Sequence, residues 1–148
     1  MNIFEKWNNT INTESIKEGI NNANKNNTKE FVEVPHGVYE VKIDSMQLKE
    51  SKSGSPMVSI WFKIVEGEFK NQMIFMNQIV MQGFQVHIVN EFLRSLDTGL
   101  EIEFDNYIQY NELLLDILEE VDGKLEFALE YGEKNGFNTF KIKEVFDI

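Results

Sequence analysis

The sequence predicts a mainly β domain whose third and fourth strands are separated by helices. Three observations support this fold class: five segments alternate apolar and polar residues, the middle of the chain changes to helical spacing, and Gly or Asn marks the boundaries. A chain of 148 residues that is 42% hydrophobic can bury one core. We expect residues 31–148 to form this domain. Residues 1–30, rich in Asn, are expected to form an arm that is mobile or docks on a partner.

The first three strands are expected between residues 38 and 81. In residues 38–48, Tyr39, Val41 and Ile43 alternate with Glu40, Lys42 and Asp44. Residues 57–65 alternate again, and one phase of that strand is wholly apolar: Val58, Ile60, Phe62 and Ile64. Residues 73–81 alternate less cleanly. We favour the core for Phe75 because large aromatic residues are usually buried, and a stacking surface is the alternative.

Two helices are expected next. Val89, Phe92, Leu93 and Leu96 follow the i, i+3, i+4, i+7 spacing of an amphipathic helix, which begins near Gly83 and ends at Asp97-Thr98-Gly99. A second helical run ends at Asp122-Gly123. Its apolar residues share one face, and four acids lie largely opposite: Glu112, Asp116, Glu119 and Glu120.

The last two strands are expected at residues 124–131 and from residue 137 onward, joined by a loop in which Asn135-Gly136 is a turn signal. Phe146-Asp147-Ile148 is interpreted as a short acidic, apolar-ended tail, similar to those with which single-strand binders recruit replication proteins. The order β-β-β-α-α-β-β predicts an OB-fold-like, five-stranded barrel with an extra acidic helix. Such barrels bind oligonucleotides across their second and third strands.

The formal charge of −11 is unevenly distributed. Residues 31–90 hold six acids and five Lys, whereas residues 91–122 hold ten acids and one base, Arg94. A negative protein is disfavoured as a diffuse binder of polyanions, but a local positive groove remains compatible with this charge.

The sequence lacks the residues that most enzymes need. It has no Cys, and neither His36 nor His87 has carboxylates at metal-binding spacing. Glu101, Glu103 and Asp105 alternate, and we interpret them as a solvated edge rather than a cation site. No phosphate-binding glycine loop or nucleophile elbow occurs. We therefore predict no catalytic residue, no metal and no cofactor. Because no apolar run matches a signal peptide or membrane span, we expect a cytoplasmic protein without membrane contact.

Three segments carry a family resemblance. Val34-Pro35-His36-Gly37-Val38-Tyr39-Glu40-Val41-Lys42-Ile43 resembles an opening P-x-G-x-Y-x-V-x-I, and Lys52-Ser53-Gly54-Ser55-Pro56-Met57 resembles a K-S/T-G-x-P-M loop. Residues 62–71 resemble an F-K-I-x-x-G-x-F/Y-K-G turn, with Asn71 where the pattern often has Gly. These motifs are similar to those of a bacteriophage family long described only as a domain of unknown function.

That family is regarded as similar to single-stranded-DNA-binding proteins and is found among phage replication and recombination genes. The resemblance implies a viral protein that binds single-stranded DNA in an infected or lysogenic bacterium, with phage replication or recombination proteins as further partners. It spans about residues 31–148.

Single-strand binding needs aromatic faces for stacking and cations along the phosphates. Trp61 is the leading candidate for stacking, because it lies opposite the apolar phase of its strand. The open alternative is that Trp61 packs under residues 1–30 or at a subunit interface. Phe137, at a loop exit, is a second aromatic candidate. The candidate cations lie in the predicted strands and loops: Lys42, Lys49, Lys52, Lys63, Lys70, Lys134, Lys141 and Lys143. A homodimer is plausible because two linked sites bind more tightly than one.

The acidic helix supports a different function. A stripe of Glu112, Asp116, Glu119 and Glu120 could simply be solvated, or it could dock a basic partner. In its sharpest form this alternative is DNA mimicry, in which carboxylates replace phosphates and block a host nuclease or a CRISPR effector.

Overall fold

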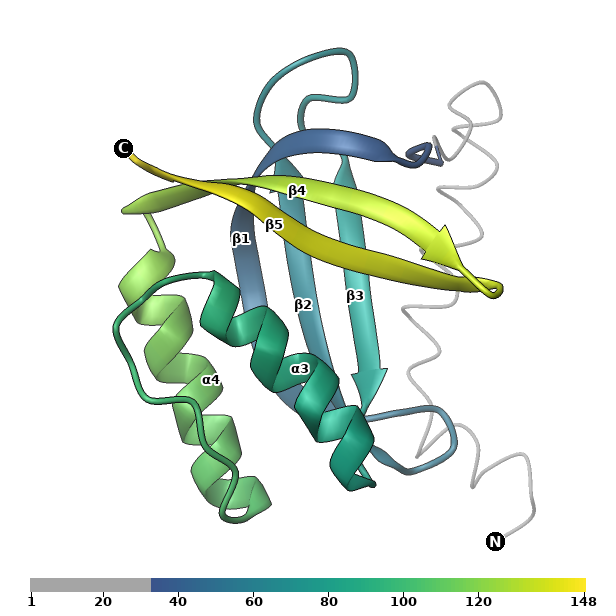
Figure 1. The fold of residues 1–148 in the computed structure, drawn as a ribbon, viewed down its shortest axis with the longest axis vertical. Coiled ribbons are helices and arrows are strands. Elements are labelled where there is room, and N and C mark those ends of the chain that lie inside the picture. The colour runs from purple at the N-terminus through teal and green to yellow at the C-terminus, as the bar shows by residue number, and fades with distance from the viewer. Residues whose placement is uncertain (1–32) are drawn as a thin grey trace, which may run out of the picture. The chain divides into compact units, whose positions relative to one another are not determined.

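The computed structural model describes residues 33–148, which form five strands and two helices in the predicted order (Figure 1). The expected arm at residues 1–30 lies outside the described residues. The elements are β1 (Gly37–Glu50), β2 (Pro56–Ile64), β3 (Met73–Ile79), α3 (Gly83–Ser95), α4 (Tyr107–Val121), β4 (Leu125–Lys134) and β5 (Phe137–Asp147). Neither α3 nor α4 is long and apolar enough to cross a membrane.

The strands form one antiparallel sheet in the order β3-β2-β1-β4-β5. Strand β1 is shared between two parts of this sheet: residues 37–41 pair with β4, and residues 41–50 pair with β2. A bulge between Ile43 and Ser45 falls just after this change of partner. Bulges bend and twist a strand, so it helps β1 to turn from one part of the sheet to the other.

The sheet is open, so a closed barrel is not confirmed. Within residues 33–148, β3 and β5 are the two edges and do not pair with each other. Helix α3 contacts both edge strands. The ring centroid of Phe62 on β2 lies 5.8 Å from that of Phe92 on α3 and 6.2 Å from that of Phe140 on β5. Side-chain packing through α3 therefore joins the edges that backbone hydrogen bonds would join in a closed barrel.

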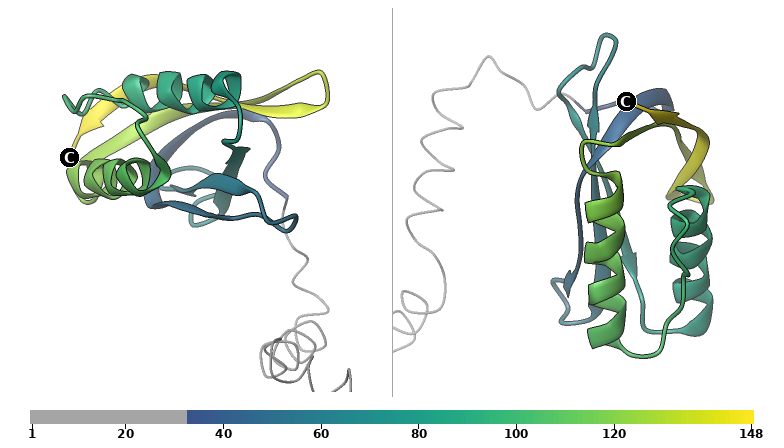
Figure 2. Two further views of the ribbon diagram at one scale, coloured as in Figure 1. Left: turned by 90° about the horizontal axis from the view of Figure 1, so that it is seen from below. Right: turned by 90° about the vertical axis from the view of Figure 1, so that its left-hand side faces the viewer.

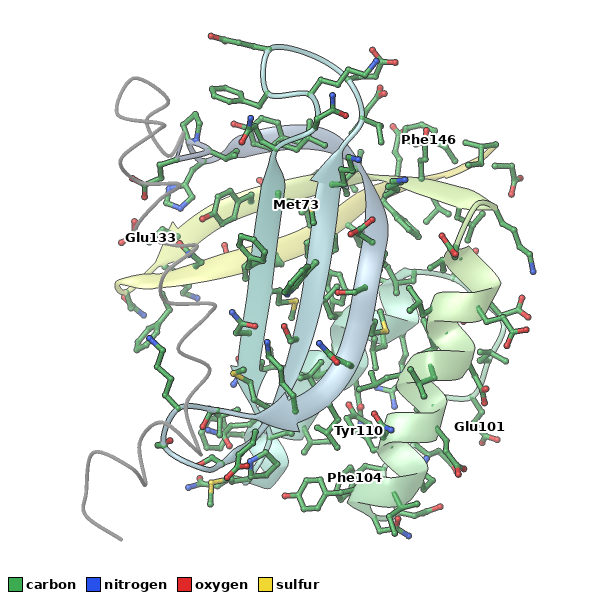
Figure 3. All side chains as sticks on the ribbon, turned by 180° about the vertical axis from the view of Figure 1, so that it is seen from behind. Met73, Glu101, Phe104, Tyr110, Glu133 and Phe146 are labelled. Atoms are coloured by element: carbon green, nitrogen blue, oxygen red, sulfur yellow. The ribbon has the colours of Figure 1, made fainter. Side chains whose placement is uncertain are left out.

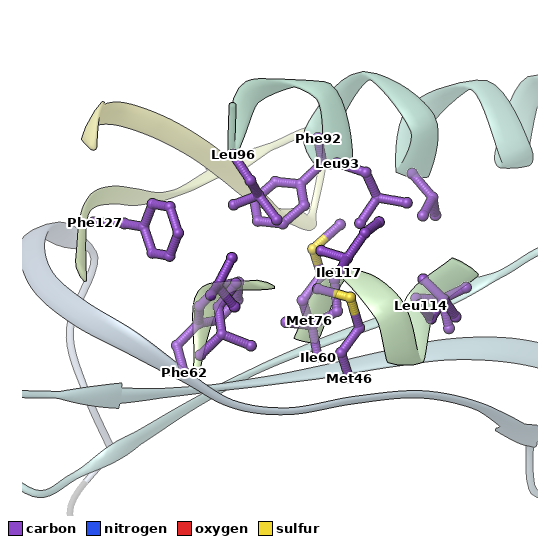
Figure 4. Close-up of a cluster of buried hydrophobic side chains, with 14 of the residues drawn as sticks. Met46, Ile60, Phe62, Met76, Phe92, Leu93, Leu96, Leu114, Ile117 and Phe127 are labelled. Atoms are coloured by element: carbon purple, nitrogen blue, oxygen red, sulfur yellow. The ribbon is translucent and has the colours of Figure 1, made fainter. Parts of the chain in front are cut away.

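Both helices lie on the same side of β1–β3, which we call the inner face (Figure 2). The core forms there, and Figure 4 shows Phe62, Ile60 and Met76 of the sheet near Leu93 and Ile117 of the helices. Helix α4 packs against β1 and is capped at its N-terminus by Asn106, whose side chain accepts a hydrogen bond from the Gln109 backbone amide. Amphipathic spacing thus determines which face of each helix is buried.

The predicted Asn135-Gly136 turn is confirmed. Asn135 and Gly136 have φ values of 54° and 82° and form a two-residue turn between the paired residues Lys134 and Phe137. Both positions are left-handed, which Asn and Gly tolerate best. Asn71 also has a positive φ of 73°, so the position where the resembling pattern has Gly requires the same backbone conformation.

Two predictions are wrong. Phe75 is 42% exposed rather than in the core, because β3 buries the other phase of its alternation, Ile74 and Met76. The expected tail is also incorrect, since Phe146 and Asp147 are strand residues that pair with Glu126 and Leu125. Strand β5 continues past Lys143 because β4 offers pairing partners back to its first residue.

Candidate nucleic-acid interface

The side chains that point away from the core on β1–β3 form a continuous surface, seen from its own side in Figure 3. We call it the outer sheet face. The strand register and the alternation along each strand place these residues on it: Lys42, Ser45, Gln47, Lys49, Met57, Ser59, Trp61, Lys63, Met73, Phe75, Asn77 and Ile79. This set contains three Lys, and two exposed carboxylates of β1 flank Lys42 on the same phase: Glu40, and Asp44 in the bulge.

An aromatic pair lies at the centre of this face. Trp61 and Phe75 are direct partners across β2 and β3, and their rings meet edge to face with centroids 5.3 Å apart. Trp61 is partly buried, whereas Phe75 is 42% exposed. The pair therefore presents a fixed aromatic surface to solvent, of the kind on which a nucleotide base can stack.

Two lysines are brought together at one end of the face. Lys42 and Lys63 are direct partners across β1 and β2, and both are partly buried. Like charges opposite each other destabilise a sheet by up to about 1 kcal/mol. The ion pairs found within residues 33–148 are Glu91–Arg94 and Glu130–Lys143, so neither lysine is neutralised by a described carboxylate. An anion bound between them would relieve the repulsion.

Lys49 contributes a third cation. Its Nζ lies 5.8 Å from the centroid of the Trp61 ring, within the range of a cation–π contact. Lys52 and Lys70 are exposed in the loops at opposite ends of β2, so they extend the positive surface in both directions without joining the aromatic pair.

The remaining predicted residues belong to a different region, the β4–β5 hairpin. Lys141 is the register partner of Glu130, and the Nζ of Lys143 lies 3.9 Å from a Glu130 carboxylate oxygen. Lys134 and Phe137 flank the turn, where Phe137 is 76% exposed. The structure therefore does not bring these four residues together with Trp61, and their strands carry five acids against three Lys.

A hydrogen-bond chain holds the aromatic pair in place. The indole N–H of Trp61 donates to Ser59 Oγ at 3.1 Å, and the Ser59 hydroxyl donates to Asn77 Oδ1 at 2.8 Å. Ser59 is fully buried. Because the indole nitrogen is hydrogen-bonded at its edge, the orientation of the Trp61 ring is fixed before any ligand arrives.

The predicted acidic stripe is present on α4. Glu112, Asp116, Glu119 and Glu120 are all exposed, beside Ile108 and Leu115, which are 79% and 48% exposed. Glu101, Glu103 and Asp105 precede the helix. A side-chain hydrogen bond with Glu101, and then that residue's charge, raises the pKa of Glu103. No cluster of three or more His, Asp or Glu side chains suited to a metal ion occurs in residues 33–148.

A hollow of about 290 Å³ lies beside α3, lined in part by His87, Asn90, Arg94 and Tyr107. Three of its polar side chains have partners within the protein: Arg94 donates to the Ile102 carbonyl and Tyr107 to the Val80 carbonyl. Asn90 accepts the hydroxyl of buried Tyr110 at 2.5 Å. These three side chains of the hollow therefore serve the packing of α3 against neighbouring segments.

Sequence reasoning ranked Phe75 as a core residue ahead of a stacking residue, and it missed Asn77 as a member of the candidate site. Asn77 was the available signal: a polar side chain two residues from Phe75 lies on the same face of a strand, and its presence indicates that this face meets solvent. Ile79 obscured the alternation, because it is an apolar residue in the same phase as Phe75 and Asn77.

The fold and site define a protein built on an open five-stranded sheet, one face of which carries lysines and two aromatic rings and is not covered by any other element of residues 33–148. Residues 21–128 match the sequence profile of the family described as "Protein of unknown function (DUF669)", and the chain belongs to that family. No curated protein matches the chain.

Proposed function

We propose that the protein binds single-stranded DNA on the outer sheet face, largely independently of sequence. One observation carries this proposal: the Lys42–Lys63 pair and the Trp61–Phe75 pair lie on adjacent rows of the same sheet face. Phosphates would bind the lysines while bases stack on the rings. The resemblance to phage proteins supports a role in phage replication or recombination, in the cytoplasm of the infected host.

The relation to an OB-fold belongs to the same proposal. Pairing β3 with β5 would close the observed strand order into a five-stranded barrel. The candidate surface also spans β2 and β3, the strands on which that fold binds oligonucleotides. A homodimer would double the contacts on one strand of DNA and raise the affinity.

Fluorescence anisotropy with labelled oligo-dT tests the proposal. We expect saturable binding that weakens with salt, with a slope of about −2 in the log–log plot if three lysines contact phosphates. The double variant Trp61→Ala, Lys63→Ala should lose this binding, because stacking contributes about 1–3 kcal/mol per base. The matched control is Lys141→Ala, Lys143→Ala in the β4–β5 hairpin, which should bind normally. Absence of binding by the unmodified protein at low salt would end the proposal.

A second candidate function uses α4. The exposed stripe of Glu112, Asp116 and Glu119 lies beside exposed Ile108 and Leu115, a combination suited to a basic partner with apolar side chains. The partner would be a nuclease or CRISPR effector whose DNA site the carboxylates occupy. Inhibition of DNA cleavage by a purified effector, lost on charge reversal at the three acids, would support this function; cleavage unaffected by the unmodified protein would oppose it.

A further inference from the structure

Strand β3 is the outermost of the strands β1–β3 and has free backbone groups along one side (Figure 1). The Ile64 amide donates to the Gln72 carbonyl just before β3, and the Val80 amide donates to the Pro56 carbonyl just after it. Hydrogen-bonded pairs alternate along an antiparallel ladder, so the even-numbered residues of β3 bond to β2. The odd-numbered residues turn their backbone N–H and C=O groups to the free edge: Met73, Phe75, Asn77 and Ile79.

Within residues 33–148, these edge groups are almost all without a hydrogen-bond partner. The exception is the Ile79 carbonyl, which accepts a bond from the Gln78 side chain. Such a row of unpaired groups is a template for another strand.

Strand β3 also lacks the features that protect an edge from pairing. Natural edge strands carry charges, Pro or bulges that keep other strands away. Residues 73–79 contain no Pro, no charged residue and no shift of register, and β3 is the one strand of the described sheet without a charge. The other edge, β5, carries Lys141, Lys143, Glu144 and Asp147. The free edge of β3 is therefore suited to an uncharged strand.

A second copy of β3 meets this requirement. Laid antiparallel with full overlap, β3 places Met76 opposite the partner's Met76 and Phe75 opposite the partner's Asn77. The odd-numbered residues then meet as hydrogen-bonded pairs, and no like charges face each other. The same overlap of β5 with itself would set Lys141 opposite the partner's Lys143, and these two charges repel.

We infer that two copies associate through β3, so that their outer sheet faces join into one surface. This inference rests on the proposed function and assigns the interface of its homodimer. Phe75 and the partner's Phe75 become diagonal neighbours, which lie about 7–8 Å apart in a sheet. The two Trp61–Phe75 pairs then form one row, and the partner contributes half of the stacking surface. Because one strand buries little area, the dimer is weak in isolation and is favoured by DNA that contacts both copies.

A cysteine test in the full-length protein is direct, because the sequence has no Cys. Met76→Cys places one thiol opposite its own copy, where facing Cα atoms about 4.5 Å apart suit a disulfide. Ile74→Cys is the matched control. Ile74 and Met76 are equally buried on the same face, at 3% and 4% exposure. Ile74 lies roughly 14 Å from the partner's Ile74, since four residues of extended strand separate them. Mild oxidation should give a covalent dimer with Met76→Cys alone, seen on a non-reducing gel.

A backbone test uses Ile79. Ile79→Pro removes an N–H from the free edge and leaves the bonds to β2 in place, whereas Ile79→Val keeps that N–H. Sedimentation velocity over a range of concentrations, with and without oligo-dT, should show loss of the dimer in the Pro variant only. The ratio of the affinities for oligo-dT of about 20 and about 6 nucleotides should fall about tenfold in the Pro variant relative to the Val variant. Thermal unfolding of each variant verifies that the fold is retained.

The outcomes separate this inference from the proposed function. The β3 interface is overturned by a parent protein that stays monomeric with and without oligo-dT, or by a dimer that persists in Ile79→Pro. It is equally overturned if Met76→Cys forms no covalent dimer, or if Ile74→Cys forms as much of it. Each of these results leaves DNA binding by a single copy intact. A dimer linked through Met76→Cys that binds no oligo-dT overturns the proposed function and leaves the interface standing.

Discussion

The inner and outer faces of β2 and β3 are built from alternate residues of the same two strands, yet they differ in chemistry. The inner face is apolar, and Val58, Ile60 and Phe62 on it are completely buried. The outer face carries Trp61, Lys63 and Phe75, which are partly or largely exposed. The period of two separates stability from the candidate binding function, so each should respond to its own substitutions.

The largest expected effect is on the inner face. Phe62 is fully buried and contacts rings on both α3 and β5, so Phe62→Ala should lower the free energy of unfolding by about 3–5 kcal/mol. Urea denaturation followed by circular dichroism measures this change. DNA affinity of the folded fraction should stay near that of the parent protein; a selective loss of affinity would show that the two faces are not separable.

The second effect distinguishes binding from stability on the outer face. Lys42→Glu places a carboxylate opposite Lys63 and turns a repulsive cross-strand pair into an attractive one. The free energy of unfolding should rise by about 0.2–1 kcal/mol, while oligo-dT affinity falls at least tenfold. Lys141→Glu is the control for charge alone. A stable variant that still binds DNA as tightly as the parent would exclude the Lys42–Lys63 pair from the site.

A third effect concerns pH and involves only the interior. Burial raises the pKa of the Tyr110 hydroxyl well above its ordinary value, although the charge of Arg94 opposes the shift. The unfolded chain releases the Tyr110 proton at about pH 10, whereas the folded chain still holds it there. The free energy of unfolding should therefore fall as the pH rises above about 10.

Tyr110→Phe tests this pH dependence. Near neutral pH the variant should be less stable by about 1 kcal/mol, because the hydrogen bond to Asn90 is lost. The difference between variant and parent should shrink above about pH 10, and unfolding in urea at a series of pH values measures it. A constant difference across that range would contradict the burial argument.

The smallest effect is expected on α4. Neutralising the stripe with Glu112→Gln, Asp116→Asn and Glu119→Gln should change oligo-dT affinity by less than about twofold at physiological salt. The reason is that salt screens the α4 carboxylates from DNA bound on the outer sheet face, because the Debye length is only about 8 Å. A large gain in affinity would mean that the acidic helix restrains DNA binding, and would extend the candidate site beyond the sheet.

The sequence predicted the element order because the two periods, 2 for strands and 3.6 for helices, are local properties. It also predicted the Asn135-Gly136 turn, since the left-handed backbone there restricts the residue type. The open edge between β3 and β5 could not be predicted in this way. Whether two distant strands pair depends on the bend of β1 and on the position of α3, which no single segment encodes.

The candidate site was predicted in part for the same reason. Alternation placed Trp61, Lys42 and Lys63 on one face, as observed. It could not show that Lys143 faces Glu130, because the register of β4 and β5 shifts between Ala128 and Leu129. The role of Ser59 was also beyond local patterns, since it depends on Asn77, 18 residues away along the chain.

The contact of α3 with both sheet edges has a consequence for local motion. Residues 57–63 of β2 have pairing partners on each side, whereas β3 and β5 each have a neighbouring strand on one side only. The amides of β3 and β5 that have no neighbouring strand should exchange with deuterium when the domain opens partially and α3 shifts. The amides of β2 should exchange only when the whole domain unfolds, so that the distance between β3 and β5 varies while β2 stays rigid.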